Sequence, residues 1–199
     1  MTPTRDGRPT AAPRRRADAE RSVAQIMQAA LEALASDPEA SMAEIARRAG
    51  VVRATIYVHF PTRDALIAAV TDRGIAEAVE AIEAAEPERG DAADALRRVV
   101  EAAWSTLGRY HALVAINAQL PQAELHHRHH QVLAALTPLI ERGQREGTFR
   151  SDVPAAWHVS MVLALIHAAS AELRAGSLPE EEIGPAVVTT ILGALSHRP

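Results

Sequence analysis

The chain contains no cysteine and no lysine, and only 3% of its 199 residues are aromatic. Without cysteine there is no disulfide bond, no thiolate metal site and no cysteine nucleophile. No uninterrupted apolar run reaches the ~18 residues that a membrane-spanning helix needs. The first residues, MTPTRDGRPTAAPRRRAD, are basic but lack a following apolar segment, so we expect no secretory signal. A soluble cytoplasmic protein without a membrane partner is therefore expected.

Motifs of catalysis are also missing. The sequence contains no P-loop, no dinucleotide-binding glycine pattern and no nucleophile motif, so we expect no enzyme activity and no cofactor. The histidine cluster HHRHH (His126–His130) admits a metal site as an alternative, because Glu124 and His127 form an E-x-x-H pair. A di-iron bundle would need a second such helix, which the sequence lacks. We interpret the cluster as a polar, solvated helix start or loop and assign no metal ligand.

Charge is unevenly distributed along the chain. The net charge is −4, yet residues 1–74 hold 11 arginines and 9 acidic residues, whereas residues 75–199 hold 10 and 16. Residues 1–17 combine five arginines with one aspartate and have no hydrophobic periodicity, so we predict a disordered basic arm. A mildly basic end on an acidic body would orient the protein on a polyanion.

Apolar residues recur at helical spacing through the rest of the chain, so an all-α fold is predicted. Pro138 should kink its helix or give it an irregular opening turn, and Ser177 with Glu180 predicts a capping box at the start of the last helix. The predicted helices cover residues 18–35, 42–49, 53–60, 63–85, 92–107, 110–120, 122–146, 154–175 and the stretch after 177.

The stretch Ser41–Phe60, SMAEIARRAGVVRATIYVHF, predicts two short helices joined by a tight turn. Ser41 and Glu44 form a capping box for the first helix, and Gly50 ends it with a positive φ. The second helix starts at Val52 or Arg53. This arrangement is typical of a helix-turn-helix, whose second helix enters the DNA major groove.

The face of the second helix indicates how it would bind. Ile56 and Phe60 share the inward side, while Ala54, Thr55, Val58 and His59 lie opposite, with Arg53 and Tyr57 along the edge. Arg53 could bind guanine O6 and N7, and Val58 could contact a thymine methyl group. Thr55, Tyr57 and His59 carry donors suited to phosphate oxygens. An ordinary αα-hairpin is the alternative interpretation of helix, glycine and helix alone.

From Ile26 to Leu66 the sequence resembles the DNA-binding domain of the TetR family of bacterial transcriptional regulators. The matching stretches are IMQAALEAL, AEIARRAGV, RATIYVHF and PTRDAL. The resemblance implies a three-helix DNA-binding domain over residues 18–66, with Arg63 at a phosphate-binding place and Ser41 among the DNA-contact candidates. Val52 and Val58 depart from the polar residues that the family often has there, so the operator sequence stays open.

Residues 67–199 are predicted to form a helical domain for effector binding and dimerisation. WHVSMVLALIHAASAEL is apolar nearly all round, so its helix must be covered on two sides, and a second copy of the chain is the simplest second cover. A small-molecule pocket is predicted in this domain from a set of polar and aromatic residues near apolar faces. The family resemblance implies such a pocket as well. The candidates are Trp104, Tyr110, His111, Asn117, Trp157, His158 and Met161, with Gln119 and His167 nearby.

The sequence therefore predicts a dimeric regulator that binds double-stranded DNA at a near-palindromic operator. A repressor released by a small-molecule effector, hydrophobic or amphipathic in character, is the favoured hypothesis. The alternative is an all-α ligand- or metal-binding protein, or an enzyme, in which the helix pair is incidental.

Overall fold

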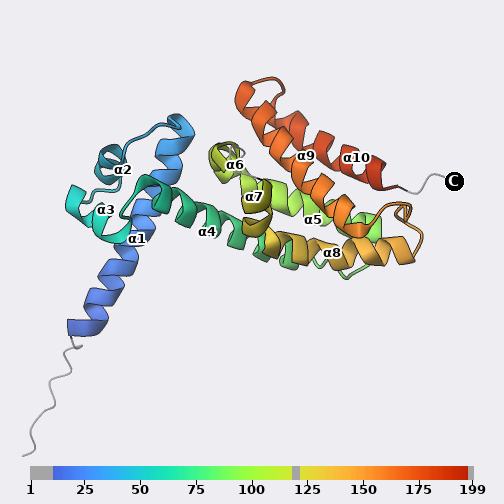
Figure 1. Cartoon of the computed structure of the whole chain (residues 1–199), viewed down its shortest axis with the longest axis horizontal. Coiled ribbons are helices and arrows are strands. Elements are labelled where there is room, and N and C mark those ends of the chain that lie inside the picture. Colours follow the sequence, from blue (N-terminus) through green and yellow to red (C-terminus); the bar gives the residue numbers. More distant parts are fainter. Residues whose placement is uncertain (1–10, 118–121, 197–199) are drawn as a thin grey trace, which may run out of the picture. The chain divides into compact units, whose positions relative to one another are not determined.

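The computed structural model describes residues 11–117 and 122–196. Over these residues the chain forms α-helices, one short 3-10 helix and no strand, apart from a single bridge between Phe149 and Ser196 (Figure 1). The predicted all-α fold class is confirmed. The chain divides into two compact units between Ile67 and Ala68, and each unit is described by itself below.

The first unit contains α1 (Ala11–Ser36), α2 (Met42–Arg48), α3 (Arg53–His59) and the start of α4 (Arg63–Ala84). Its core consists of buried side chains from all four helices, among them Ile26, Leu34, Ile45, Ile56 and Leu66. Helical spacing of apolar residues places one stripe of each helix inward. The unit therefore has the three-helix arrangement that the sequence predicts, with α4 leading out of it.

Three local signals define these helices, and those at Ser41 and Gly50 are as predicted. The Ser41 hydroxyl accepts the Glu44 N–H at 3.2 Å and caps α2. Gly50 has φ +69 after α2, a backbone conformation that L side chains rarely adopt. The Thr62 hydroxyl accepts the Ala65 N–H at 3.1 Å at the start of α4. Val52 precedes α3 without a side-chain cap.

The predicted disordered arm is wrong for residues 11–17, because α1 begins at Ala11 and not at Asp18. Alanine and arginine are good helix formers. Arg16 also pairs with Glu20 one turn later at 3.1 Å. Residues 1–10 lie outside the described part of the chain.

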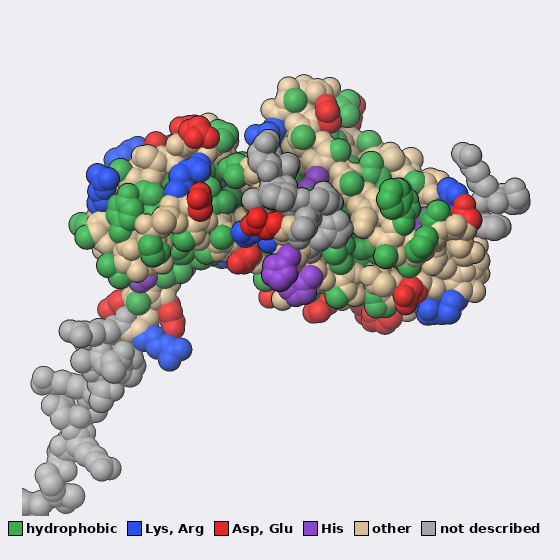
Figure 2. Space-filling view, in the orientation of Figure 1, with side chains coloured by type: hydrophobic (Ala, Val, Ile, Leu, Met, Phe, Trp, Pro, Cys, Tyr) green, Lys and Arg blue, Asp and Glu red, His purple; other side chains and the backbone are tan. Residues whose placement is uncertain are grey.

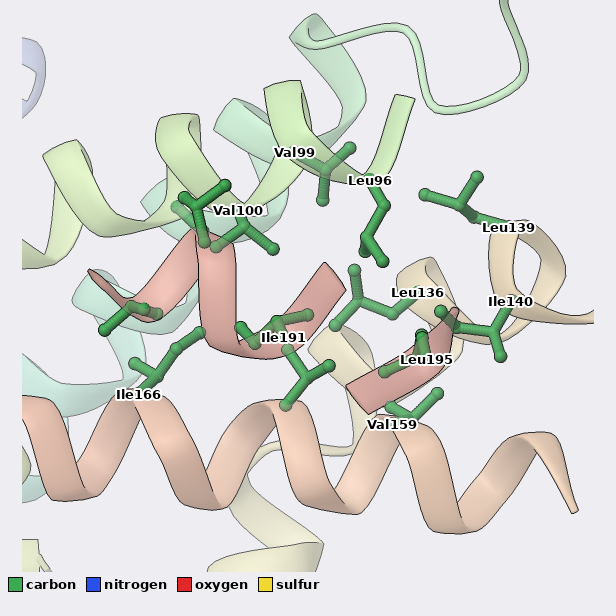
Figure 3. Packing of buried hydrophobic residues seen from close by; sticks show 14 of the residues in the cluster. Leu96, Val99, Val100, Leu136, Leu139, Ile140, Val159, Ile166, Ile191 and Leu195 are labelled. Carbon is green, nitrogen blue, oxygen red and sulfur yellow. The ribbon is translucent and has the colours of Figure 1, made fainter. Parts of the chain in front are cut away.

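The second unit is a helical bundle built on one apolar core (Figure 3). Leu96 of α5, Leu136 of α8, Val159 of α9 and Ile191 of α10 meet in this core. Besides the remainder of α4, its elements are α5 (Ala92–Leu107), η1 (Gly108–Tyr110), α6 (His111–Asn117), α7 (Gln122–Arg128), α8 (His130–Arg145), α9 (Ala155–Ala175) and α10 (Glu180–Leu195).

The single helix predicted over residues 122–146 is wrong, because the chain forms α7 and α8 with a break at His129. The His129 ring donates from Nδ1 to the Leu125 carbonyl at 2.8 Å, one turn earlier. Side-chain bonds of this kind compete with the helical ladder and bend it. Pro138 lies inside α8, nine residues past the break, so proline is not its cause.

The predicted capping box of the last helix is also wrong. Pro179 occupies the N-cap of α10, with φ −63, and no side chain caps this end. The Ser177 N–H instead binds the Glu172 carbonyl at 3.2 Å and closes α9, where Gly176 has φ +68. Residues 118–120, predicted to continue the helix that begins at Tyr110, lie outside the described residues.

Helix α9 is long and apolar enough, by length and composition, to cross a membrane. In the structure it packs against α6, α8 and α10. It is thus a core helix of the second unit, although part of its surface stays uncovered.

Candidate DNA-binding surface and ligand cavity

Helix α3 presents an outward face that combines apolar and polar side chains. Ile56 is fully buried, whereas Val58 is 77% exposed and Tyr57 is 39% exposed. Ala54 is exposed, and Thr55 and His59 are half-buried. The predicted inward side, Ile56 and Phe60, is confirmed. The outward side is shifted from the predicted one, because Arg53 and Tyr57 are exposed together with Ala54 and Val58, whereas Thr55 and His59 lie at its edge.

Arg53 lies at the first turn of α3, with its guanidinium 5.8 Å from the centre of the Tyr57 ring. A cation over an aromatic face is held weakly in place. This contact directs the guanidinium along the exposed side of the helix. Val52, just before it, is 71% exposed. Figure 2 shows arginine and hydrophobic side chains next to one another on the visible face of this unit.

Two of the predicted DNA contacts have intramolecular partners in the structure. The Arg63 guanidinium donates from Nε to the Ala40 carbonyl at 3.3 Å and from Nη2 to the Pro38 carbonyl. The Ser41 hydroxyl is the N-cap of α2. Both side chains thus shape the α1–α2 loop and the start of α2. Arg47, at the end of α2, is largely exposed.

The second unit encloses an apolar cavity of about 50 Å³. A second cavity of about 30 Å³ shares Ile75, Leu107, Val114 and two histidines with it. Val99 and Val100 of α5, Leu136 of α8 and Ile166 of α9 belong to the wall of the first cavity and appear in Figure 3. The second cavity adds Thr71, Gly74, Tyr110, Leu113 and Asn117.

His129 and His167 line both cavities. Their ring centres are 5.1 Å apart, with the edge of one ring toward the face of the other. Burial, together with a smaller effect of the neighbouring His129, lowers the pKa of His167 to about 4. His167 is therefore a neutral imidazole at physiological pH.

Asn117 and Tyr110 connect the cavity wall to α4. Asn117 of α6 donates from Nδ2 to the Thr71 hydroxyl at 2.9 Å, and both residues are buried. Tyr110 packs over Gly74, where an added Cβ would lie 2.8 Å from the tyrosine ring. Burial, together with the hydrogen bond to Glu77, raises the pKa of Tyr110 to about 12.

Glu77 on α4 binds two arginines next to this contact. It accepts Arg73 Nε at 2.9 Å and Arg109 Nη2 at 2.7 Å. Burial alone would raise the pKa of Glu77, but the hydrogen bonds from Arg73 and Tyr110 and the charge of Arg109 outweigh it and lower that pKa. The carboxylate thus stays ionised and holds η1 against α4.

The structure brings together only some of the predicted pocket residues. Tyr110 and Asn117 line the smaller cavity. His111 is buried beside them and donates from Nδ1 to the Ser170 hydroxyl at 3.0 Å, since that hydroxyl gives its own proton to Ile166. The Trp104 ring lies 4.9 Å from His111 and does not line either cavity.

The other three candidates lie in the first half of α9, away from both cavity linings. Trp157 is 65% exposed. His158 is buried and donates from Nε2 to the Arg150 carbonyl at 3.2 Å. Met161 packs on the core cluster. Gln119 lies outside the described residues.

The cavity residues that sequence reasoning missed include Thr71, Gly74 and His129. The available signal for His129 was its place in the HHRHH cluster, which was interpreted as solvated. His127 and His130 do line an open groove with Asp72 and Glu124, with the two imidazoles stacked at 6.0 Å. Among the described residues, no three His, Asp or Glu side chains are placed to hold a metal ion.

Comparisons with known proteins agree with this geometry. The sequence model described as bacterial regulatory proteins of the tetR family matches residues 26–70. The chain is 30% identical over 181 residues to the HTH-type transcriptional repressor LfrR of Mycolicibacterium smegmatis, covering 90% of this chain and 93% of LfrR. It is 29% identical over 149 residues to the HTH-type transcriptional regulator NfxB of Pseudomonas aeruginosa, covering 72% and 78%.

The chain also resembles a solved structure of LfrR. The crystal structure of LfrR from Mycobacterium smegmatis in complex with proflavine superposes with a TM-score of 0.70 at 27% identity, covering 90% of this chain and 98% of that one. The fold, the α3 face and the relatives lead to one conclusion. The chain belongs to the TetR family of bacterial regulatory proteins and is a DNA-binding transcriptional regulator.

Proposed function

We propose that the protein is a dimeric cytoplasmic repressor that binds a near-palindromic operator and is released from it by a small molecule in the second unit. The observation that carries this proposal is the division of α3, with Ile56 buried and Val58 and Tyr57 exposed. LfrR is named a repressor, which supports the same role for this chain. Its complex with proflavine supports a small-molecule effector.

The contacts with DNA are assigned along the exposed face of α3. Arg53, held by the Tyr57 ring, binds the O6 and N7 atoms of a guanine. Val58 lies against a thymine methyl group, because an apolar side chain this exposed gains nothing from water. Thr55, Tyr57 and His59 bind phosphates, and the small Ala54 lets the helix approach the groove. For Ser41 and Arg63 the intramolecular bonds favour a supporting role.

The dimer interface is assigned to the uncovered faces of α9 and α10, which lie side by side in Figure 1. Their exposed positions between the helix ends carry small or uncharged side chains, so a second copy can approach closely. These residues are Trp157, Ala164, Ala168 and Ala171 of α9 and Ala186, Thr189, Thr190 and Gly193 of α10. An isologous four-helix interface would cover both faces.

Effector binding is coupled to DNA binding through α4. The Asn117–Thr71 bond and the Tyr110–Glu77 contact both join the cavity wall to this helix, which begins in the first unit. A ligand that displaces Asn117 or Tyr110 therefore pushes on α4. Because such coupling is reciprocal, operator DNA must weaken effector binding by the same factor.

Selection of bound sites from a random duplex pool tests the proposal most broadly. We expect a near-palindrome whose half-sites lie about one helical turn, ~34 Å, apart. Affinity for the recovered duplex should fall with rising salt, as phosphate contacts require. A protein that is monomeric, or that shows no sequence preference at moderate salt, would contradict the proposal.

A further inference from the structure

The described walls of the two cavities lack the charged side chains that much of the protein surface carries. Their walls contain no Asp, Glu or Arg among the described lining residues. The polar groups at hand are the His129–His167 pair, the Tyr110 phenol and the bonded Asn117 and Thr71 side chains. Of these, His167, Tyr110, Asn117 and Thr71 are uncharged at neutral pH.

This wall disfavours a cationic guest. A cation moved from water into an apolar cavity loses its hydration, and no carboxylate is present to replace it. An anion meets two imidazoles, each of which can accept a proton and become its counter-ion. His129 donates from Nδ1 to the Leu125 carbonyl, so its neutral ring has Nε2 as the basic nitrogen.

We propose that the effector is a compact weak organic acid, with an apolar body in the larger cavity and its acid group against His129 and His167. This inference rests on the proposed function and specifies the chemistry of its effector. Compactness follows from the cavity volumes of about 50 and 30 Å³, which leave space for only a few water molecules. A larger guest has to displace the α6 or α8 side of the wall.

Binding then includes one proton transfer. The acid's O–H bond breaks and an imidazole N–H bond forms, which leaves a carboxylate beside an imidazolium. Above the acid's own pKa, which is near that of a glutamic acid side chain at ~4.3, the free ligand is a carboxylate and the proton comes from solvent. Proton uptake on binding means that affinity should rise as pH falls from 8 to 6, by up to about tenfold per pH unit.

Other titratable groups near the pair could contribute to that proton uptake. Tyr110 lies on the smaller cavity from η1, and its pKa is too high for it to titrate between pH 6 and 8. The residues that α5, α6 and α8 contribute to the two linings are uncharged. Outside the walls, Glu77 binds Arg73 and Arg109, and Arg128 of α7 pairs with Glu124 at 3.1 Å.

Three probes with one apolar body separate the possibilities. They are 3-methylbutanoate, 3-methylbutan-1-ol and 3-methylbutylammonium, and calorimetric titration of the full chain at pH 6, 7 and 8 measures their binding. We expect the acid to bind at least about tenfold more tightly than the ammonium at pH 6. Its affinity should fall with rising pH, whereas that of the alcohol should not.

Variants locate the effect in the cavity. His167→Phe should weaken acid binding about tenfold or more and leave alcohol binding within about threefold, because only the counter-ion is lost. His130→Phe is the matched control, since His130 is exposed next to His129 and lines neither cavity. His167→Gln keeps a polar side chain without a basic nitrogen, and it should resemble His167→Phe if the proton acceptor is what matters.

The results distinguish this inference from the proposed function. Tighter binding of the ammonium, an acid affinity independent of pH, or no binding of any probe at millimolar concentration would overturn the inference. Release of the selected duplex is measured in parallel. Release by the ammonium and not by the acid would overturn the acid assignment and keep the effector-released repressor, whereas acid binding without release would keep the cavity chemistry and contradict the repressor mechanism.

Discussion

The two units of the chain differ in how directly their sequences determine their surfaces. In the first unit the exposed face of α3 follows from a short helix between Gly50 and Phe60 whose inward residue is Ile56. In the second unit the cavity is assembled from side chains of several helices that are far apart in the sequence. A recognition surface on one helix can be predicted locally, whereas a ligand site between helices depends on how they pack.

The largest effect should separate the inward from the outward side of α3. Ile56→Ala removes a fully buried side chain and should lower the free energy of unfolding of the first unit by about 2–5 kcal/mol. Val58→Ala, two residues away and exposed, should change it by no more than about 0.5 kcal/mol. Thermal denaturation followed by circular dichroism measures both. Equal losses would show that the α3 faces are misassigned.

A pH series tests the buried imidazole of the second unit. The pKa of His167 is lowered to about 4 from 6.5, so the unfolded chain binds a proton there that the folded chain does not. Its contribution to stability is thus complete above about pH 6.5 and is lost as pH falls toward 4, a change of about 3 kcal/mol. His167→Phe should flatten this part of the unfolding free energy between pH 6.5 and 4, and an unchanged slope would contradict the burial of the ring.

The contact of Tyr110 with α4 should be sensitive to a single methyl group. Gly74→Ala places a Cβ 2.8 Å from the Tyr110 ring and should cost about 1–3 kcal/mol of stability. Gly108→Ala is the matched control, because it has helical φ and ψ values and open space around its Cβ position. It should be neutral or stabilise by up to about 1 kcal/mol. Urea denaturation of both variants measures the difference, and a harmless Gly74→Ala would remove the proposed contact from the coupling route.

The smallest change should affect DNA recognition and leave the second unit intact. Arg53→Ala should weaken binding of the selected duplex by about 1–3 kcal/mol and relax the preference for guanine at one position. Arg89→Ala removes an exposed arginine of the second unit, paired with Glu86 at 2.9 Å, and should leave affinity unchanged. Fluorescence anisotropy with duplexes altered at single positions measures both. A uniform loss over all duplexes would reassign Arg53 from base to phosphate contact.

The same contrast explains what the sequence could predict. Ser41, Gly50 and Thr62 act on residues within three positions of themselves, so their roles in the first unit were predictable. The early start of α1 does not follow from the sequence pattern, because residues 11–17 have a basic composition typical of a disordered arm as well as helix-forming alanine and arginine. The all-α fold class and the family followed from patterns that repeat over many residues.

Prediction was weaker where tertiary packing decides the outcome. An α9 that is apolar nearly all round gives no signal for which side faces the cavity, so Trp157, His158 and Met161 were grouped with Tyr110 and Asn117, although only the last two line a cavity. Ser177 does not cap α10 as its sequence pattern predicts, because its N–H takes part in the turn that closes α9.

His129 shows the same limitation most clearly. A cluster of histidines resembles a solvated surface in the sequence, and for His130 the side chain is exposed. Its neighbour His129 instead follows the end of α7, and its ring packs edge to face against that of His167 in the cavity wall. Only the packing of α8 against α9 distinguishes the two.

The most direct test of the central claim is the stoichiometry and selectivity of the protein on its selected duplex, measured by sedimentation at moderate salt. The claim is that a symmetric dimer places one α3 helix from each chain into neighbouring major grooves. Two chains, or a multiple of two, should bind each near-palindromic duplex, and changing one half-site should weaken binding sharply. One chain per duplex, or equal binding to a scrambled duplex, would contradict it.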